Sequence, residues 1–237
     1  MNEQNIPTHV GFILDGNGRW AKKQGKVRVK GHVAGKEAIL NIIEECGNLG
    51  IKYVSVYAFS TENFTRPLHE VDFIMKLFDT AFKKDIHRVA ENNVKVVFSG
   101  IKDNLAPSLV KSMDKVTENS KNNTGLVLNI CFHYGSQMEI IDMVKKIHQD
   151  LNKKELKLKD LTPEIINKYM YNDLPPLDLI IRTSGEQRLS NFMLWQAAYA
   201  ELYFTNTYWP DFNKEELNIA IKAYQDRNRR FGGVDDD

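Results

Sequence analysis

Near its N-terminus the chain reads Val10-Gly-Phe-Ile-Leu-Asp-Gly-Asn-Gly-Arg-Trp20, in which an apolar run ends at a polar turn. The run at 10–14 is short and apolar, which is typical of a strand buried on both faces of a parallel sheet. The turn opens with Asp15 and contains Gly16 and Gly18. This stretch therefore predicts a buried strand that leads through a glycine turn into a helix.

Apolar runs alternate with helical patterns from this stretch to the end of the chain. We expect further strands at 53–59, 94–98, 126–132 and 179–181. Helical periodicity covers the stripe Ile39, Ile42, Ile43 and Cys46 and the segments 71–89, 104–120, 136–151 and 217–224. Helix starts are predicted where Thr162 precedes Pro163 and where Asn213 precedes Glu216. The alternation predicts one α/β domain over 1–237, with a central, mainly parallel sheet flanked by helices.

The composition is that of an ordinary folded protein. Hydrophobic residues make up 42% and charged residues 27% of the 237, which argues against disorder. The 32 basic and 31 acidic residues nearly cancel, so charge predicts no general nucleic-acid binder. No apolar run reaches the roughly 18–20 residues of a membrane span, and the start lacks a signal-peptide pattern. Cys46 and Cys131 form no disulfide framework, so we expect a cytosolic protein with reduced thiols and flexible ends at about 1–8 and 233–237.

The turn after the first strand could bind an anion. Its glycines let the backbone approach a ligand closely, and N–H groups at a helix start favour a phosphate. Asp15 adds a carboxylate at which Mg²⁺ could meet phosphate oxygens. The turn is neither a Walker P-loop nor a Rossmann fingerprint. The alternative is a tight strand-to-helix turn with Asp15 as its cap.

A basic segment follows this turn. From Gly16 to Lys36 there are seven Lys and Arg residues and no acid. They are Arg19, Lys22, Lys23, Lys26, Arg28, Lys30 and Lys36, with His32 among them. Such a run is commonly a solvated basic face. Beside a glycine turn and an acid that could bind a metal, it favours an anion site.

Two more polar clusters follow predicted strands, where ligands bind in open α/β sheets. The first is Ser60-Thr-Glu-Asn-Phe-Thr-Arg66, which alone would be an N-capping loop. The second contains Arg182, Arg188 and Ser190, and guanidinium groups at this spacing could grip one diphosphate. Glu201 leads into an apolar run, and its plainer interpretation is a salt-bridged strand residue. These features suit phosphoryl-bearing substrates, but the residues alone do not choose the reaction.

Several stretches resemble the cis-prenyltransferases, most closely those of the bacterial undecaprenyl diphosphate synthase type. They are 9–20, 57–67, 182–192, 194–204, 209–212 and 229–233, which follow the family's order over nearly the whole chain. The resemblance implies the family's fold with an apolar tunnel for the growing chain. It also implies a transferase that adds isopentenyl diphosphate to farnesyl diphosphate, yielding di-trans,poly-cis-undecaprenyl diphosphate for the cell-wall lipid carrier.

The resemblance assigns roles to the matching residues. Asp15 and Glu201 would hold Mg²⁺, and Asn63 would act in proton loss from the incoming unit, in a loop with Ser60, Thr61 and Glu62. The allylic diphosphate and its prenyl chain would lie against Gly16, Asn17, Gly18, Arg19, Trp20, Arg28, His32, Phe64 and Arg66. Isopentenyl diphosphate would bind Arg182, Arg188, Leu189 and Ser190.

Some positions depart from the family's commonest pattern. Gln187 stands where many relatives carry a metal-associated His, and Phe64 replaces a frequent Trp. His133 and Gln137 replace an Asn and an Arg, so we expect the local network, but not the reaction class, to differ from that of the family.

The alternatives are a short-chain, cyclising or branching synthase, and a non-catalytic partner subunit. Partner subunits characteristically lose the Asp-Gly-Asn element, which is intact here. We further expect a homodimer in which Arg230-Phe-Gly232 reaches the partner's site, no nucleic-acid partner, and a cytoplasmic enzyme. Its contact with the inner membrane face would be transient and would serve product release.

Overall fold

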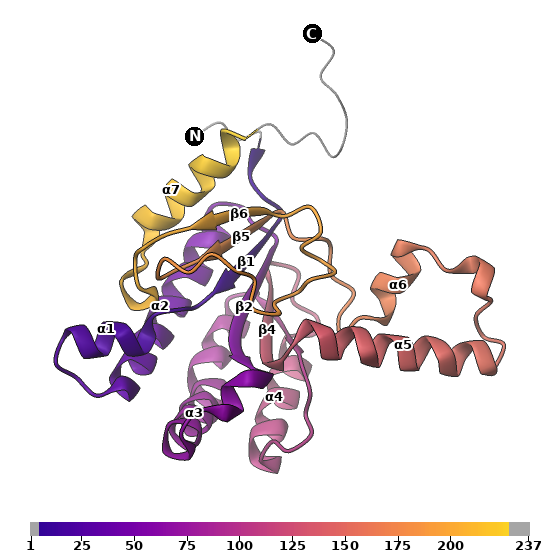
Figure 1. Ribbon diagram of the computed structural model, residues 1–237, viewed down its shortest axis with the longest axis horizontal. Helices are drawn as coiled ribbons and strands as arrows, with labels where there is room; N and C mark the ends of the chain where they lie inside the picture. The colour runs from indigo at the N-terminus through magenta and orange to yellow at the C-terminus, as the bar shows by residue number, and fades with distance from the viewer. Residues whose placement is uncertain (1–4, 228–237) are drawn as a thin grey trace, which may run out of the picture. The chain divides into compact units, whose positions relative to one another are not determined.

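The computed structural model describes residues 5–227 and has the α/β architecture that the alternating pattern predicts (Figure 1). Its strands are β1 (His9–Ile13), β2 (Tyr53–Ser60), β3 (Lys95–Ser99), β4 (Val127–Tyr134), β5 (Leu179–Arg182) and β6 (Glu201–Phe204). They form a six-stranded sheet in the order β3-β4-β2-β1-β5-β6. The β1–β5, β5–β6 and β3–β4 pairs are parallel. The predicted fold class is confirmed, and each predicted strand lies within a residue or two of its expected position.

The chain folds into two compact units, each assembled from segments that are distant in sequence. The first unit contains the chain up to Val54, Pro176–Gln187 and the chain from Gln196 onward. The second contains Ser55–Pro175 and Arg188–Trp195. A single domain over 1–237 stays a prediction. Residues 1–4 and 233–237, which belong to the ends expected to be flexible, lie outside the described residues. Thr8 was also expected to be flexible, but its carbonyl accepts a hydrogen bond from the backbone N–H of Tyr53 at 2.9 Å.

The first unit packs helices against β1, β5 and β6. They are α1 (Asn17–Lys23), α2 (Arg28–Asn48), the 3₁₀ turn η4 (Trp209–Asp211) and α7 (Lys214–Gln225). A side chain at Gly31 would place its Cβ 1.8 Å from the carbonyl oxygen of Asn17, so only glycine lets α2 approach α1 this closely. Buried Trp209 lies 5.9 Å from Phe12 of β1 between ring centroids, which anchors the turn after β6 to the core.

The second unit contains most of β2 together with β3, β4 and their helices. These are η2 (Thr61–Thr65), α3 (Leu68–Glu91), α4 (Pro107–Ser120), α5 (Ser136–Asn152), η3 (Leu158–Asp160) and α6 (Pro163–Tyr169). Phe132 of β4 packs edge-on against Phe78 and Phe82 of α3, at 4.8 and 5.8 Å between ring centroids. The apolar stripe predicted at 71–89 therefore faces β4.

The predicted helix starts are also confirmed. The side chain of Thr162 accepts a hydrogen bond from the N–H of Ile165 at 3.3 Å, and that of Asn213 accepts from Glu216 at 3.1 Å. Both cysteines are buried, and neither forms a disulfide. Among residues 5–227, no helix combines the length and apolar character that crossing a bilayer requires.

Candidate active site

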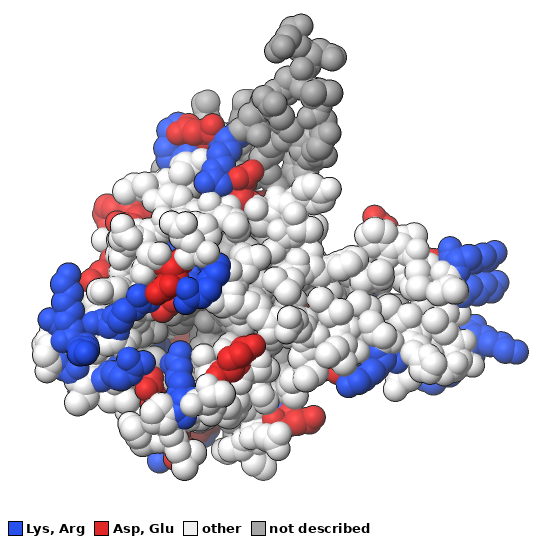
Figure 2. All heavy atoms as spheres, in the orientation of Figure 1, with Lys and Arg blue, Asp and Glu red and all other residues white. Residues whose placement is uncertain are grey.

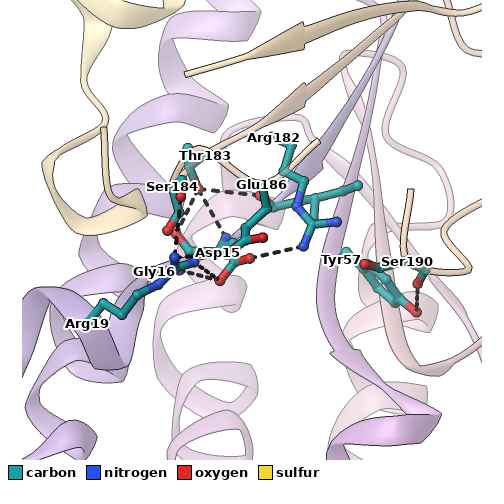
Figure 3. A network of polar contacts seen from close by, with 10 residues as sticks. Asp15, Gly16, Arg19, Tyr57, Arg182, Thr183, Ser184, Glu186 and Ser190 are labelled. Atoms are coloured by element: carbon teal, nitrogen blue, oxygen red, sulfur yellow. Dashed lines mark hydrogen bonds and ion pairs between the residues drawn. The ribbon is translucent and has the colours of Figure 1, made fainter. Parts of the chain in front are cut away.

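The turn after β1 is held by the segment that follows β5, within the first unit. The backbone N–H of Asp15 donates to Thr183 Oγ1 at 3.0 Å, and the Thr183 hydroxyl donates to the Asp15 carbonyl at 2.8 Å. The N–H of Gly16 donates to Asp15 Oδ1 at 2.7 Å (Figure 3). Because Ile13 and Arg182 are paired in register, the two strands end together and bring their following loops into contact.

The Asp15 carboxylate lies between two arginines. Arg182 Nη2 donates to Oδ2 at 3.0 Å, and Arg19 Nη2 donates to Oδ1 at 3.1 Å (Figure 3). Burial raises the pKa of Asp15, but the hydrogen bond and charge of Arg182, followed by those of Arg19, outweigh it and lower the pKa below its usual value. Arg19 Nη1 also donates to Glu186 Oε1 at 2.9 Å. Asp15 is therefore ionised at neutral pH and fixed in orientation.

Glycine at position 16 leaves room for this arrangement. Its φ of +99° lies in the left-handed region, and a Cβ there would meet Ser184 Oγ at 2.6 Å and the Tyr208 ring at 2.7 Å. At Gly18 a Cβ would lie 2.7 Å from the guanidinium of Arg28. The predicted basic segment thus brings Arg28 against the glycine turn, and an anion site at this turn stays a prediction.

Lysine and arginine side chains gather over α1 and the start of α2 at the left of Figure 2. Helix α1 has no acidic residue in its first turn and ends with Lys22 and Lys23. Arg28 is exposed and His32 is half-buried in the first turns of α2. This face of the first unit presents an unbalanced positive charge, which attracts anions.

The buried Ser184 hydroxyl lies beside the Asp15–Gly16 turn and has no hydrogen-bond partner among the described residues. Leaving such a group unsatisfied costs about 1–3 kcal/mol, so a ligand or a water at the turn would stabilise it. Asn17 Oδ1 also has no partner there, but it lies against Gly35 of α2 and Trp209 rather than at the turn. Ser184 was not among the predicted binding residues. The sequence feature that could have identified Ser184 is its position directly after Arg182-Thr183, at the end of a predicted strand.

The donor set around Asp15 suits Mg²⁺ that is shared with a substrate. Mg²⁺ prefers oxygen ligands and commonly takes one or two carboxylates together with substrate phosphates. Within the described part of the chain, no three His, Cys, Asp or Glu residues cluster as a metal cage. Asp15 alone could therefore hold the ion only with a phosphate-bearing ligand, to which the unsatisfied Ser184 hydroxyl could donate.

The structure does not bring Glu201 to this turn. Glu201 pairs in register with Leu179, the first residue of β5, whereas Arg182 at the Asp15 end pairs with Phe204. Three residues of strand separate the two positions, or about 10 Å. The Glu201 carboxylate instead forms an ion pair with Arg227. Its predicted role as a metal ligand stays a prediction.

Trp20 lies at the edge of the first unit's site. Its indole Nε1 donates to Asp211 Oδ1 at 2.6 Å, and Lys26 Nζ lies 5.2 Å from the centre of its ring. The Trp20 ring is therefore held by a hydrogen bond to Asp211 and by a cation–π contact with Lys26. Gln187, the replacement for a metal-associated His, is exposed after Glu186.

The second unit contains the other predicted loop, Ser60–Arg66. The side chains and backbone groups of Ser60 and Asn63 form a reciprocal capping box that fixes η2. The amide of Asn191 donates to Glu62 Oε1 at 3.0 Å. Burial raises the pKa of Glu62, but the Asn191 hydrogen bond and local backbone and hydroxyl contacts lower it below its usual value. Arg66 forms an ion pair with nearly buried Glu70 at 3.5 Å.

The segment 188–195 packs against this loop within the same unit. Tyr57 Oη donates to the carbonyl oxygens of Ser190 and Tyr134, at 3.2 Å each. Ser190, Asn191 and Met193 all have positive φ, at +49°, +63° and +42°. Arg188 and Ser190 are exposed and Leu189 is half-buried. Arg182 belongs to the first unit and Arg188 to the second, so their joint grip on one diphosphate stays a prediction.

An aromatic wall lines the second unit beside η2. Phe64 lies 5.0 Å from Phe59 and 4.6 Å from His133 between ring centroids, in edge-on contacts. His133 has a φ of +49°, and its Nδ1 lies 3.1 Å from the carbonyl of Ile101. The other departure, Gln137, is exposed and uses its backbone N–H to bind Asn191 Oδ1 at 2.9 Å. His133 and Gln137, the two residues that differ from the family's commonest pattern, therefore each make defined contacts with their neighbours.

The chain is similar to isoprenyl transferases over nearly its whole length. Isoprenyl transferases from Fusobacterium nucleatum and Streptococcus mutans are 48% and 49% identical over 98% and 97% of the chain, and the chain covers 98% and 94% of them. Lavandulyl diphosphate synthase from Lavandula x intermedia, solved with dimethylallyl diphosphate, superposes with a TM-score of 0.92 at 32% identity, covering 96% of this chain and 98% of that one.

A probable undecaprenyl diphosphate synthase from Campylobacter jejuni superposes with a TM-score of 0.80 at 30% identity, covering 97% of this chain and 100% of that one. These structures place the fold among the prenyl diphosphate synthases. A family model described as putative undecaprenyl diphosphate synthase matches residues 13–232. The chain belongs to the undecaprenyl diphosphate synthase family of prenyltransferases.

Proposed function

We propose that this protein condenses isopentenyl diphosphate onto farnesyl diphosphate, in repeated steps, to make undecaprenyl diphosphate. The observation that carries the proposal is the ionised Asp15 beside the unsatisfied Ser184 hydroxyl, in a glycine turn flanked by Arg19, Arg28 and Arg182. Such a site suits a substrate whose leaving group is a diphosphate. The named isoprenyl transferases among its relatives support the reaction class.

The residues of the first unit would bind and activate the allylic diphosphate. Asp15 would hold Mg²⁺ against the phosphate oxygens, where the ion supplies stabilisation of the charge that develops as the diphosphate leaves. Gly16 and Gly18 let the backbone reach the same oxygens, and Arg28 lies against Gly18. Arg182 keeps Asp15 ionised and aimed, so that the carboxylate needs no reorganisation during the reaction.

The residues of the second unit would serve the incoming isopentenyl unit. Arg188 and Ser190 are exposed, so a second diphosphate could reach them. Asn63, fixed by its capping box with Ser60, would act in the proton loss from the incoming unit that forms the new double bond. Phe64 presents its ring beside His133 as an aromatic wall for the prenyl chain. Chemistry of this kind depends on orientation and charge stabilisation more than on a strong base.

The similarity to lavandulyl diphosphate synthase favours one alternative, a synthase that makes a short, cyclised or branched product. The identity of 48% to a bacterial isoprenyl transferase over nearly the whole chain supports the elongating enzyme instead. One assay separates them: labelled isopentenyl diphosphate with farnesyl diphosphate and Mg²⁺, followed by chromatography of the products. A C55 ladder supports the proposal, whereas a single short product supports the alternative. No product at any primer length would indicate a partner subunit.

The remaining expectations belong to this proposal. Undecaprenyl diphosphate would serve as the lipid carrier in cell-wall synthesis, and the enzyme would act in the cytoplasm with transient contact at the inner membrane face. A homodimer would complete the site with Arg230-Phe-Gly232, which lies outside the described residues. Sedimentation should give about twice the monomer mass of 27.3 kDa, and truncation before Arg230 should reduce turnover. A fully active monomer would refute the dimer.

A further inference from the structure

The Thr183 hydroxyl contacts both peptide groups that flank the Cα of Asp15, and both residues belong to the first unit. The hydroxyl accepts a hydrogen bond from the N–H of Asp15 at 3.0 Å and donates one to the carbonyl of Asp15 at 2.8 Å (Figure 3). Thr183 itself is fully buried. Because φ and ψ are the rotations of these two rigid peptide groups about the Cα, a single side chain restrains both backbone dihedrals of Asp15.

The backbone of Asp15 does not need this hydroxyl to satisfy its hydrogen bonds. Its N–H also donates to the carbonyl of Ile13 at 3.0 Å, and its carbonyl also accepts from the N–H of Trp209 at 3.0 Å. Each group would therefore keep a partner without Thr183, so removing the hydroxyl would leave no backbone group buried and unpaired. What the hydroxyl adds is a restraint on the orientation of Asp15.

Arg182, which directly precedes Thr183 in the chain, holds the side chain of the same acid. Its Nη2 donates to Asp15 Oδ2 at 3.0 Å, while the N–H of Gly16 donates to Oδ1 at 2.7 Å. Two consecutive residues at the end of β5 thus restrain Asp15, one through its carboxylate and one through its backbone. A rotation of either peptide group would carry the carboxylate away from Arg182 and weaken a charge-assisted bond that depends on close geometry.

A group that stabilises developing charge is effective only if it is in place before the reaction begins. Threonine suits the task of holding such a group, because its β-branched side chain has few χ1 rotamers and loses little freedom when it is fixed. We propose that Thr183 is a positioning residue, which holds the backbone of Asp15 so that the carboxylate keeps the orientation required when the allylic diphosphate leaves. This inference rests on the proposed function, because it assigns Thr183 to a step of that reaction.

Steady-state kinetics of Thr183→Ala and Thr183→Ser test the role, since these two variants differ from each other by the hydroxyl alone. Thr183→Ala should lower kcat about tenfold or more while both KM values stay within about threefold, because a misplaced catalytic group costs transition-state stabilisation. Thr183→Ser should keep kcat within about threefold of wild type. The matched control is Thr205→Ala, which removes a hydroxyl that donates to Glu216 and accepts from the N–H of Thr207, each at 3.2 Å, and should leave kcat unchanged.

Amide hydrogen exchange of the full chain without substrate tests the same role independently of turnover. The amides of Asp15 and Gly16 should exchange about tenfold faster in Thr183→Ala than in wild type, and at the wild-type rate in Thr183→Ser and Thr205→Ala.

Three results would overturn the positioning role of Thr183. They are unchanged exchange at these amides in Thr183→Ala, faster exchange there with unchanged kcat, and equal losses of kcat in the Ala and Ser variants. A wild-type protein that makes no polyprenyl product would overturn the proposed function instead. In that case the exchange rates alone would still decide whether the Thr183 hydroxyl holds the Asp15 turn.

Discussion

Arg182, the last residue of β5, donates to the carboxylate of Asp15, which lies in the turn after the neighbouring parallel strand β1, at 3.0 Å. Only 4% of the Arg182 side chain is exposed. This ion pair ties the loop after β1 to the loop after β5, and the charge of Arg182 keeps Asp15 ionised.

Asp15→Asn should reduce turnover by about 10²–10³-fold or more, because it removes charge that acts mainly in the transition state. Excess EDTA should abolish wild-type activity for the same reason. Steady-state assays with farnesyl diphosphate measure both effects, and circular dichroism checks that the variant is folded. Activity near the wild-type level in the variant, or in EDTA, would contradict the proposed role.

The same pair predicts how stability depends on pH. The pKa of Asp15 is lowered on folding, so its carboxylate contributes stability that is present above the unfolded-state pKa of about 4 and lost as pH falls through the lower folded value. The difference in free energy of unfolding between wild type and Asp15→Asn should therefore shrink from pH 7 to pH 3. Urea unfolding at a series of pH values measures it. A constant difference would show that Arg182 does not stabilise the ionised form.

Ser184→Ala tests whether the unsatisfied hydroxyl awaits a ligand. Removing a buried hydroxyl that has no partner should leave the unfolding temperature unchanged or raise it. The KM for the allylic diphosphate should rise about tenfold, which corresponds to one hydrogen bond to a charged group. A loss of stability with unchanged KM would assign the hydroxyl a structural role instead.

Changes at Arg28 and at Arg188 should raise the KM values of different substrates. Arg28→Ala should mainly raise the KM for farnesyl diphosphate, because Arg28 lies against the glycine turn. Arg188→Ala should mainly raise the KM for isopentenyl diphosphate, by roughly tenfold or more, since guanidinium contacts to phosphate are charge-assisted. Initial rates with each substrate varied in turn measure both. If both variants weakened only the allylic substrate, the assignment of the second loop would be wrong.

His133→Asn restores, beside the aromatic wall, the residue that the family most commonly has at this position. Asn tolerates the φ of +49° better than His, but the variant loses the ring contact with Phe64 and the contact with the Ile101 carbonyl, so its free energy of unfolding at about pH 8 should not exceed that of wild type. Burial lowers the pKa of His133 despite its backbone contact with Ile101, so wild-type stability should fall as pH drops below about 6.5. The variant should lack this fall. An identical pH dependence in both proteins would exclude His133 as its source.

The meeting of Asp15 with Arg182 was predictable, since parallel strands end at one edge of a sheet and both residues follow buried runs. The left-handed backbone at Ser184, Ser190 and His133 was not predictable, because ordinary side chains rarely adopt it and only surrounding contacts impose it. Sequence spacing also could not place Glu201. Its partner Arg227 lies 26 residues further along the chain, and only the register of β5 with β6 shows that it lies away from Asp15.

The last prediction concerns the tunnel that would shelter the growing chain. The Asn129 amide donates to Ser55 Oγ at 3.0 Å, so these two residues share one face of the sheet. Strand alternation then puts Leu128 of β4 and Ala58 of β2 on the opposite face. Phe132 shares that face with Leu128 and packs against Phe78 of α3. The prenyl chain would therefore run between this face and α3.

Changes at the two ends of this face should shift product length in opposite directions. Ala58→Leu, near the end of β2, should block the path and give shorter products. Leu126→Ala, at the buried start of β4, should open space and give longer ones, because each added methylene gains about 0.8 kcal/mol on burial. Ser55→Ala is a matched control on the other face and should leave the product ladder unchanged. Chromatography of labelled products measures all three, and an unchanged ladder in the first two variants would remove this face from the tunnel while leaving the transferase class intact.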